Sequence, residues 1–122
     1  MPAGRRTAPA PALSGFVTGL RLLREAKHAQ ALPYFTAPAL KGTPLEHYGR
    51  YHAGLAYLGL SRPEEARGAF AQVRAAKPVG YLSEAAALRE AEAATSASDH
   101  AAAARLYEQA AQNRTAAPDA VL

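Results

Sequence analysis

The sequence predicts an all-α protein, a short right-handed α-solenoid of three helical hairpins that together supply about six antiparallel helices. Alanine, the strongest helix former, is the commonest residue in the chain. Large side chains around Tyr51 recur at three- and four-residue spacing, which places them along one side of a helix. The unit that contains them, residues 43–80, has copies on both sides, at shifts of 35 residues towards the N-terminus and 37 towards the C-terminus.

The three copies share a pattern in which small residues stay small and aromatic residues stay aromatic. The predicted core positions are Gly19, Leu22, Ala31 and Phe35 in the first copy, Gly54, Tyr57, Ala66 and Phe70 in the second, and Ala91, Ala103 and Tyr107 in the third. A single helical hairpin buries too little apolar surface to be stable alone. We therefore expect the copies to stack on one another.

The order of segments follows from the repeats. Residues 1–13 are predicted to be a disordered arm, because Ala8 to Ala12 alternates Ala and Pro, as extended linkers do. The repeat domain is predicted over residues 14–113, with units of about 14–42, 43–80 and 81–113, and residues 114–122 as a flexible tail. Solenoid ends usually carry a polar capping helix. None is predicted after residue 113, so we expect a fragment, or the start, of a longer array.

In the first unit, Ser14 is the expected N-cap of a helix over about 15–27. A second helix is predicted to start near His28. Pro33 lies inside it, where proline lacks an amide hydrogen and clashes with the preceding turn. We therefore expect this helix to be short or kinked and to end before Pro38, with a loop over 39–42.

The second unit has the clearest start signal. Thr43, Pro44 and Glu46 combine a cap, a proline in the first turn and a glutamate three residues after the cap, which is a capping box. The helix from Pro44 is predicted to end near Leu58 to Gly59. Residues 61–64 repeat the arrangement and open a helix to about Ala76, which Lys77 to Gly80 terminates.

In the third unit, Ser83 is expected to cap a helix that runs to about Ala97. Asp99 or Ser98 is expected to cap the last helix, which runs to about Asn113.

The central unit resembles the tetratricopeptide repeat family. Its pattern is matched in register by Gly54, Tyr57, Ala66, Phe70 and Pro78, with Ala53 and Val73 as variants. Arg50 stands where the family usually has a large apolar residue, and Tyr48 and Tyr51 are expected to take over its packing. More weakly, residues 45–51 and 66–70 and the repeat spacing resemble the superhelical repeat region of soluble lytic transglycosylases.

The tetratricopeptide resemblance implies a concave groove lined by the first helix of each pair. When the family's groove positions are carried over one by one, the groove of this chain is lined by Phe16, Leu20, Leu23, Tyr48, Tyr51, Leu55, Leu58 and Leu88, followed by Glu92 and Thr95. This groove is apolar and aromatic at its start. The lytic transglycosylase resemblance covers a non-catalytic region and implies no active-site residue.

Charge and cysteine content bound the partners. The chain has 14 Lys and Arg against 10 Asp and Glu, a formal net charge of +4, but residues 1–27 are basic and residues 83–122 acidic. Nucleic-acid-binding proteins usually concentrate Lys and Arg on one patch, so we expect no nucleic-acid partner. Cysteine is absent, which excludes disulfides and thiolate metal sites. We expect neither a membrane span nor, as the sequence stands, a signal peptide.

Few residues are placed for chemistry. His47 and His52 lie about 140° apart on one predicted helix, so they are not expected to hold a metal together and are interpreted as surface histidines. Glu64 and Glu65 lie in the first turn of a helix, where negative charge favours the helix dipole. The sequence has neither a Gly-x-Ser-x-Gly elbow nor a glycine-rich phosphate loop. We predict no enzyme activity, no metal and no cofactor.

Two functions remain open. The leading hypothesis is a non-catalytic protein-interaction module that binds a peptide, a partner helix or another domain in the apolar concave groove. The alternative is a structural helical segment of a cell-envelope lytic transglycosylase-like protein, with catalysis on a separate domain. Self-association through the last helix is also expected, because that helix exposes an alanine-rich face. The sequence as it stands favours the cytoplasm, and the periplasm or cell envelope if it is a fragment of an exported protein.

Overall fold

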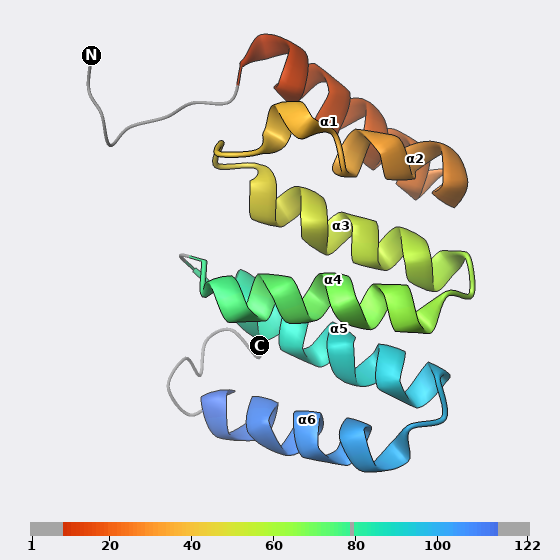
Figure 1. Ribbon diagram of the computed structural model, residues 1–122, viewed down its shortest axis with the longest axis vertical. Coiled ribbons are helices and arrows are strands. Elements are labelled where there is room, and N and C mark those ends of the chain that lie inside the picture. Colours follow the sequence, from red (N-terminus) through yellow and green to blue (C-terminus); the bar gives the residue numbers. More distant parts are fainter. Residues whose placement is uncertain (1–8, 79, 115–122) are drawn as a thin grey trace.

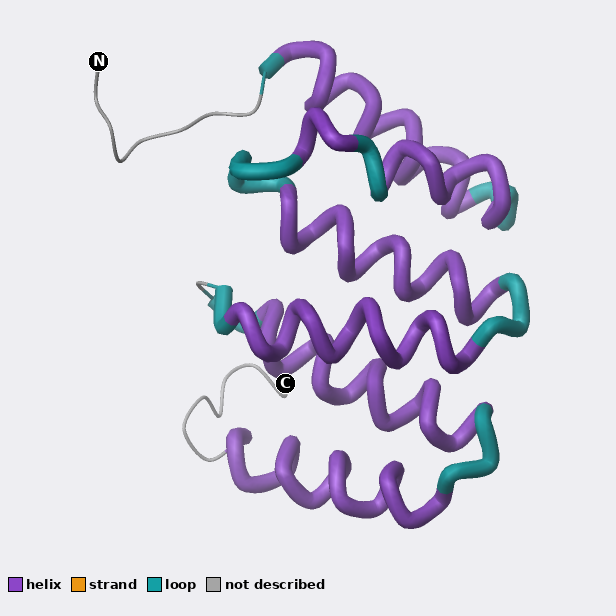
Figure 2. Tube along the Cα trace, in the orientation of Figure 1, coloured by secondary structure: helices purple, strands orange, loops and turns teal. Residues whose placement is uncertain are grey.

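The computed structural model describes residues 9–78 and 80–114, and within these ranges the protein consists of helices and loops (Figures 1 and 2). The α-helices are α1 (Ala10–Arg24), α2 (His28–Phe35), α3 (Glu46–Gly59), α4 (Pro63–Ala76), α5 (Leu82–Ser96) and α6 (His100–Arg114). A short 3-10 helix, η1 (Pro38–Leu40), lies between α2 and α3. Consecutive helices run antiparallel, and each packs against the next. The predicted all-α array of six sequentially packed helices is confirmed.

The turn inside each helical pair has the same backbone form. Its middle residue is Ala26, Ser61 or Ser98, with φ values of 62°, 60° and 63°. Glycine is the usual residue in this left-handed conformation. In each turn the next residue donates its amide hydrogen to the carbonyl five positions back, over 2.8 to 2.9 Å. The three turns are separated by the same 35 and 37 residues that align the sequence repeats, so the backbone repeats with the sequence.

Helix α1 begins earlier than predicted. It starts at Ala10, five residues before the expected position, and Pro11 lies in its first turn, where a missing amide hydrogen costs no intrahelical bond. Ala12 is 5% exposed, so part of the segment predicted as a disordered arm belongs to the core. Ser14 lies inside the helix and is not its cap.

Both chain ends extend past the described residues. The predicted arm falls outside them at 1–8, and the predicted tail at 115–122. The other helix ends lie within three residues of their predicted positions.

Serine caps none of the later helices, contrary to the prediction. Ser61 lies in the left-handed turn before α4. Ser83 lies in the first turn of α5, and its hydroxyl lies 3.5 Å from the carbonyl oxygen of Arg74. The predicted cap of α6 is confirmed, since a carboxylate oxygen of Asp99 accepts a hydrogen bond from the amide of Ala102 at 3.2 Å.

The predicted capping box at α3 is replaced by a related arrangement. The hydroxyl of Thr43 accepts a hydrogen bond from the amide of Leu45 at 3.1 Å, and a carboxylate oxygen of Glu46 accepts one from the amide of Gly42 at 3.0 Å. Each bond is displaced by one residue from the box, and the helix accordingly begins at Glu46, not at Pro44.

Helix α2 is short, as its internal Pro33 predicts. It spans 8 residues, whereas α4 spans 14 and α6 spans 15. The chain then crosses to α3 through residues 36–45, which contain η1 where a plain loop was expected (Figure 2). This long connection determines the shape of the candidate site.

The core is built from close contacts between glycine on a first helix and phenylalanine on a second. A Cβ at Gly19 would lie 2.9 Å from the ring of Phe35, and one at Gly54 would lie 2.5 Å from the ring of Phe70. Only glycine permits this approach. The predicted core residues Leu22, Ala31, Ala66, Ala91 and Ala103 are also buried, and Tyr57 is half-buried.

One predicted core residue is not buried. Tyr107 is 44% exposed, and Leu106, one position earlier, is 6% exposed and packs with Ala102 and Ala103. The 37-residue shift correctly aligns Tyr107 with Phe70 in sequence. However, no helix among the described residues follows α6, so the side chain at this position lacks the cover that Phe70 has.

Candidate functional site

The residues predicted to line the concave groove do not form one open surface. Phe16 is 7% exposed and packs edge-on against Phe35, with ring centroids 5.8 Å apart. Five others pack against the core clusters, namely Leu20, Leu23, Tyr51, Leu55 and Leu58. Tyr48 and Leu88 are 44% and 37% exposed, and Glu92 and Thr95 are exposed as well. This inner surface therefore offers two separate large apolar side chains in place of a continuous stripe.

Tyr51 is held in place by a link between two helical pairs. Its hydroxyl oxygen accepts a hydrogen bond from Nε of Arg89 at 3.2 Å, and Arg89 also pairs with Glu92 at 3.0 Å. The bond to Tyr51 raises the pKa of Arg89. Tyr51 thus takes the packing role expected of it, whereas Tyr48, for which the same role was predicted, is exposed.

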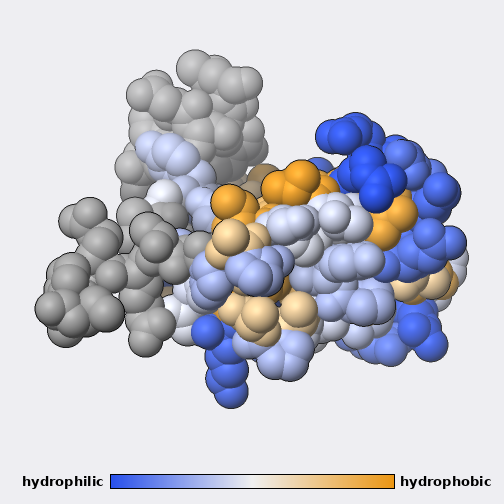
Figure 3. Space-filling model, turned by 90° about the horizontal axis from the view of Figure 1, so that it is seen from above, coloured by the Kyte–Doolittle hydropathy of each residue, from blue (hydrophilic) through white to orange (hydrophobic). Residues whose placement is uncertain are grey.

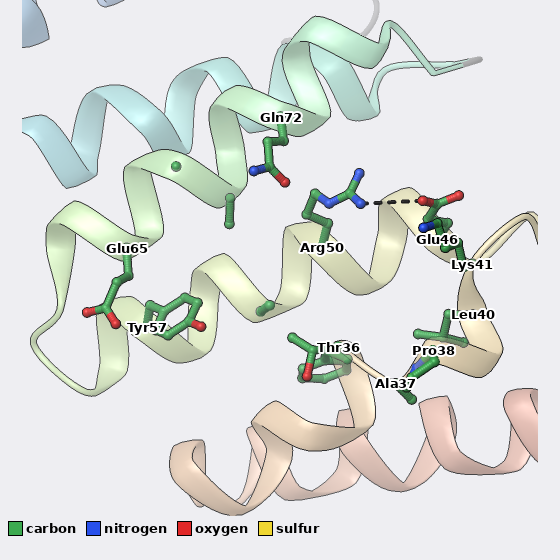
Figure 4. Close-up of a pocket in the computed structure, with 14 residues that line it drawn as sticks. Thr36, Ala37, Pro38, Leu40, Lys41, Glu46, Arg50, Tyr57, Glu65 and Gln72 are labelled. Atoms are coloured by element: carbon green, nitrogen blue, oxygen red, sulfur yellow. Dashed lines mark hydrogen bonds and ion pairs between the residues drawn. The ribbon is translucent and has the colours of Figure 1, made fainter.

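A different hollow is open beside the end of α2, and we call it the trough. Its volume is about 450 Å³. Its floor is a stripe on α3 at helical spacing, formed by Glu46, Arg50, Ala53 and Tyr57. One wall is a stripe on α4, formed by Glu65, Gly68, Ala69 and Gln72, and the other is the segment Phe35, Thr36, Ala37, Pro38, Leu40 and Lys41. Figure 4 shows α3 lying between α4 on one side and the segment from Thr36 to Lys41 on the other.

The trough is open for two reasons: α2 ends early, and the side chains that face the space are small. Helix α2 stops at Phe35, and η1 turns aside, so the groove beside α3 and α4 is not filled by further turns of α2. The facing side chains are also small, at Ala53, Gly68 and Ala69. A Cβ built at Gly68 meets nothing within 4 Å in the described part of the chain. Gly68 is therefore a wall position where a side chain can be added without an immediate clash.

The ends of the trough are polar and its middle is apolar. At one end Nη2 of Arg50 lies 3.3 Å from a carboxylate oxygen of Glu46, with Lys41 close by (Figure 4). The amide of Gly42 donates to the same carboxylate, and this bond lowers the pKa of Glu46. At the other end is Glu65 (Figure 4). Arg50 and Lys41 therefore line the same end of the trough, where the carboxylate of Glu46 is paired with Arg50.

The trough was not predicted from the sequence. Its signal was present in Arg50, which occupies a position where the tetratricopeptide resemblance leads one to expect a large apolar residue. A charged residue at a packing position indicates that the position faces solvent. The shortness of α2 was predicted from Pro33, but its consequence for the neighbouring surface was not.

His52 is a packed residue and not the surface histidine that was predicted. Its ring lies 5.7 Å from that of Phe16, 5.4 Å from Phe35 and 5.3 Å from Tyr51, between ring centroids. Its Nδ1 lies 2.7 Å from the carbonyl oxygen of Tyr48, so this nitrogen carries the hydrogen. Burial lowers the pKa of His52, and the bond to the carbonyl offsets part of that effect.

The carboxylates with buried or inter-helix positions serve structure. Glu90 is 8% exposed and receives both Nε and Nη2 of Arg74, at 2.8 and 3.3 Å, which raises the pKa of that arginine. Asp99, besides capping α6, pairs with Arg67 of α4 at 3.1 Å. Each of these ion pairs links side chains of different elements: Arg74–Glu90 links α4 to α5, and Arg67–Asp99 links α4 to the start of α6.

The described residues contain no group of three or more His, Cys, Asp or Glu side chains placed to hold a metal ion. Within the same residues no helix has the length and apolar character needed to cross a membrane.

No family model matches the chain, and neither a curated protein nor a solved structure is significantly similar to it. Classification therefore rests on architecture, an all-helical array of sequentially packed antiparallel pairs.

Proposed function

We propose that this chain is a non-catalytic binding module, and that it holds an extended peptide segment of a partner protein in the trough. The observation that carries the proposal is the trough itself, an open hollow of about 450 Å³ between α3, α4 and η1. Binding sites are typically concave and mostly apolar, with a few polar groups that fix orientation. The trough has this composition, and the inner surface does not.

The chemistry of the trough defines the peptide that suits it. The small residues Ala53, Gly68 and Ala69 leave room for one large apolar side chain of the ligand. Arg50 and Lys41 bring two positive charges to one end against the single negative charge of Glu46, and this excess favours a carboxylate next to that side chain, from Asp, Glu or a chain terminus. The preferred ligand is therefore a short segment with a large apolar residue followed or preceded by an acidic group.

The proposal includes a tetratricopeptide-type identity for the repeat. Three features support it: the recurring Gly–Phe contact between the helices of a pair, the left-handed turn repeated at 35 and 37 residues, and the sequential packing of the helices. In this identity the trough lies outside the groove that the family resemblance implies, so the present chain binds on a different face.

The experiment compares two substitutions at Gly68. A phage-displayed library of random heptapeptides is selected against the wild-type protein, and the enriched peptides are synthesised and titrated against each variant. Gly68→Phe fills the trough. Gly68→Ala is the matched control, because it also removes a helical glycine, which raises helix propensity by up to about 1 kcal/mol, but it adds only one methyl group to the trough. We expect the peptides to bind the wild type and Gly68→Ala within about threefold of each other, and Gly68→Phe at least tenfold more weakly.

Two further variants locate the binding surface. Arg50→Ala should weaken peptides that carry a carboxylate and leave the remaining peptides unchanged. Tyr48→Ser combined with Leu88→Ser alters the exposed part of the inner surface and should leave all affinities unchanged. If this double variant loses binding and Gly68→Phe keeps it, the peptides bind in the predicted concave groove and not in the trough. Failure to enrich any peptide would overturn the trough proposal.

A further inference from the structure

Two terminal segments of the sequence lie outside the described residues, and one of them has the composition that the trough favours. Residues 1–8 carry two arginines and no acidic residue. Residues 115–122, which we call the tail, have Asp119 as their only charged side chain, followed by Val121 and Leu122. The tail therefore combines one carboxylate with large apolar residues close to it in sequence, which is the combination proposed above for a ligand of the trough.

The charge of the tail is complementary to one end of the trough. Arg50 and Lys41 bring two positive charges to that end, against the single negative charge of Glu46. A carboxylate from the tail balances this excess, whereas the two arginines of residues 1–8 add to it. Charge complementarity thus selects the tail over the N-terminal segment.

The positive end of the trough lies on the side of the array where α6 ends. Consecutive helices are antiparallel, so α3 begins on the side where α4 and α6 end (Figure 1). Arg50 is near the start of α3, and Gln72, near the end of α4, lines the trough beside it (Figure 4). The tail is attached to α6 at Arg114, on this same side.

A second hollow lies between the end of α4 and the end of α6. Its volume is about 490 Å³, and its lining includes Ala75 of α4 and Gln112 of α6. Gln72 of the trough and Ala75 of this hollow are one helical turn apart on α4. Gln112 is two residues before the end of α6. The tail therefore starts next to the end of α4 that borders the positive end of the trough.

The tail has the length needed to pass from α6 to the trough. From Arg114 to Asp119 the chain spans at most about 17 Å, at roughly 3.4 Å per residue. The route passes the end of one helix, α4, and the diameter of a helix with its side chains is about 10 to 12 Å. Asp119 thus comes within reach of the long side chains of Arg50 and Lys41.

The order of groups along the tail matches the order of surfaces in the trough. A chain that enters beside Arg50 meets the positive end first and the apolar middle afterwards. Ala53, in the middle, follows Arg50 by one turn of α3, about 4.5 Å along the axis. Val121 follows Asp119 by two residues, about 7 Å of extended chain. Asp119 therefore pairs with the positive end while Val121 lies over the apolar middle.

An exposed apolar surface also occurs on α1, but it lies at the far end of the array. Leu13 and Val17 of α1 are 48% and 55% exposed. Figure 3 looks down on this end and shows apolar residues gathered on it beside a strongly hydrophilic edge. Helices α1 and α6 are the first and last of the array (Figure 1). A segment that starts at the end of α6 therefore reaches the trough and not this surface.

We propose that the tail binds in the trough of its own molecule, with the carboxylate of Asp119 at the positive end and Val121 and Leu122 beside Ala53 and Gly68. The inference rests on the ligand preference proposed above for the trough. A ligand joined to its site through a short linker has an effective concentration in the millimolar range, so a weak contact suffices to fill the site. A partner peptide then has to displace the tail, and the contact is autoinhibitory.

Disulfide formation tests the position of the tail, because the chain has no natural cysteine. Ala120→Cys, between Asp119 and Val121, is combined with Gly68→Cys on the trough wall. The control pair combines it with Ala75→Cys, an exposed position two turns further along the same face of α4 and nearer to the start of the tail. Under mild oxidation at low protein concentration, the first pair should form an intramolecular disulfide about tenfold faster than the control pair.

Further changes in the tail separate docking from chance encounter. Adding Asp119→Asn or Leu122→Ser to the chain with Gly68→Cys and Ala120→Cys should slow the disulfide several-fold, because each removes one of the two contacts. Ala116→Ser changes the tail outside both contacts and should leave the rate unchanged. Circular dichroism checks that every variant keeps its helices. Equal rates for the two cysteine pairs, or a disulfide-linked dimer in place of the monomeric product, would overturn the proposal.

The peptides selected for the proposed function distinguish the two proposals. They should bind the chain with Asp119→Asn and Leu122→Ser about threefold or more tightly than the wild type, because the competing tail is weakened. Equal affinities, with loss of binding in Gly68→Phe, would overturn the role of the tail and leave the trough as a peptide site. If the disulfide forms as expected while Gly68→Phe leaves the affinities unchanged, the partner peptides bind elsewhere and the tail remains the ligand of the trough.

Discussion

Phe70 and Tyr107 occupy equivalent positions in sequence and very different environments. Phe70 is fully buried, and truncating it leaves a cavity between three helices, so we expect Phe70→Ala to cost about 3 to 5 kcal/mol in the free energy of unfolding. Tyr107→Ala removes a side chain that is 44% exposed and should cost less than about 1 kcal/mol. Denaturant titration at low protein concentration measures both. Equal losses would show that Tyr107 is covered in solution.

The stability of the protein should depend on the protonation of His52. Its pKa is lowered by burial among Phe16, Phe35 and Tyr51, so the folded state favours the neutral ring. The unfolded state takes up a proton near pH 6.5, and the folded state takes it up only at lower pH. The contribution of His52 is therefore fully present above about pH 6.5 and is lost as the pH falls towards the folded pKa.

The matched measurement is the free energy of unfolding of the wild type and of His52→Gln between about pH 7.5 and pH 5. A glutamine side chain cannot titrate, so the difference isolates this histidine from the other three. We expect the wild type to lose more stability than the variant on acidification. Parallel curves would mean that the ring is protonated equally well in the folded protein.

At the scale of elements, the repeated turn stores a small strain. Ala26, Ser61 and Ser98 adopt positive φ, which for residues with a Cβ costs roughly 1 kcal/mol relative to glycine. Ala26→Gly should therefore stabilise the protein by about 0.5 to 1 kcal/mol. The matched control is Ala104→Gly, at an exposed position in the middle of α6, which should destabilise by about 1 kcal/mol. Thermal unfolding of both variants gives the signs; a destabilised Ala26→Gly would contradict the turn geometry.

Helix ends were predicted less well than helices, for a local reason. A serine before an apolar run is compatible with a cap, with a place in the first turn and with a left-handed turn. None of Ser14, Ser61 and Ser83 is the cap that was predicted. Asp99 was predicted correctly, and its carboxylate has a second partner in Arg67 of α4. This contact with another helix accompanies the cap, and such contacts are not visible in local sequence.

At the scale of the whole molecule, the order and packing of the six helices followed from the repeat shifts and from small residues opposite phenylalanines. These are short-range features that one repeat shows by itself. The trough is different, because it arises where a short α2, the η1 segment and Gly68 of α4 meet. No single stretch of sequence predicts that these three parts of the chain lie side by side. Most of the side chains predicted to line the groove are half-buried against the core clusters, so the inner surface exposes fewer large apolar groups than the sequence pattern alone predicts.

Tyr57 is half-buried where two core clusters meet. It packs against the first cluster, with Phe35 and Ala53, and also against the second, with Phe70 and Val73. In a linear array, each unit is marginal alone and its neighbours raise its probability of being folded. Tyr57 thus couples the folding of one cluster to that of the other. Its two contacts, together with the packing of α2 on α3, favour melting of the first pair with the rest of the chain over its detachment as a separate step.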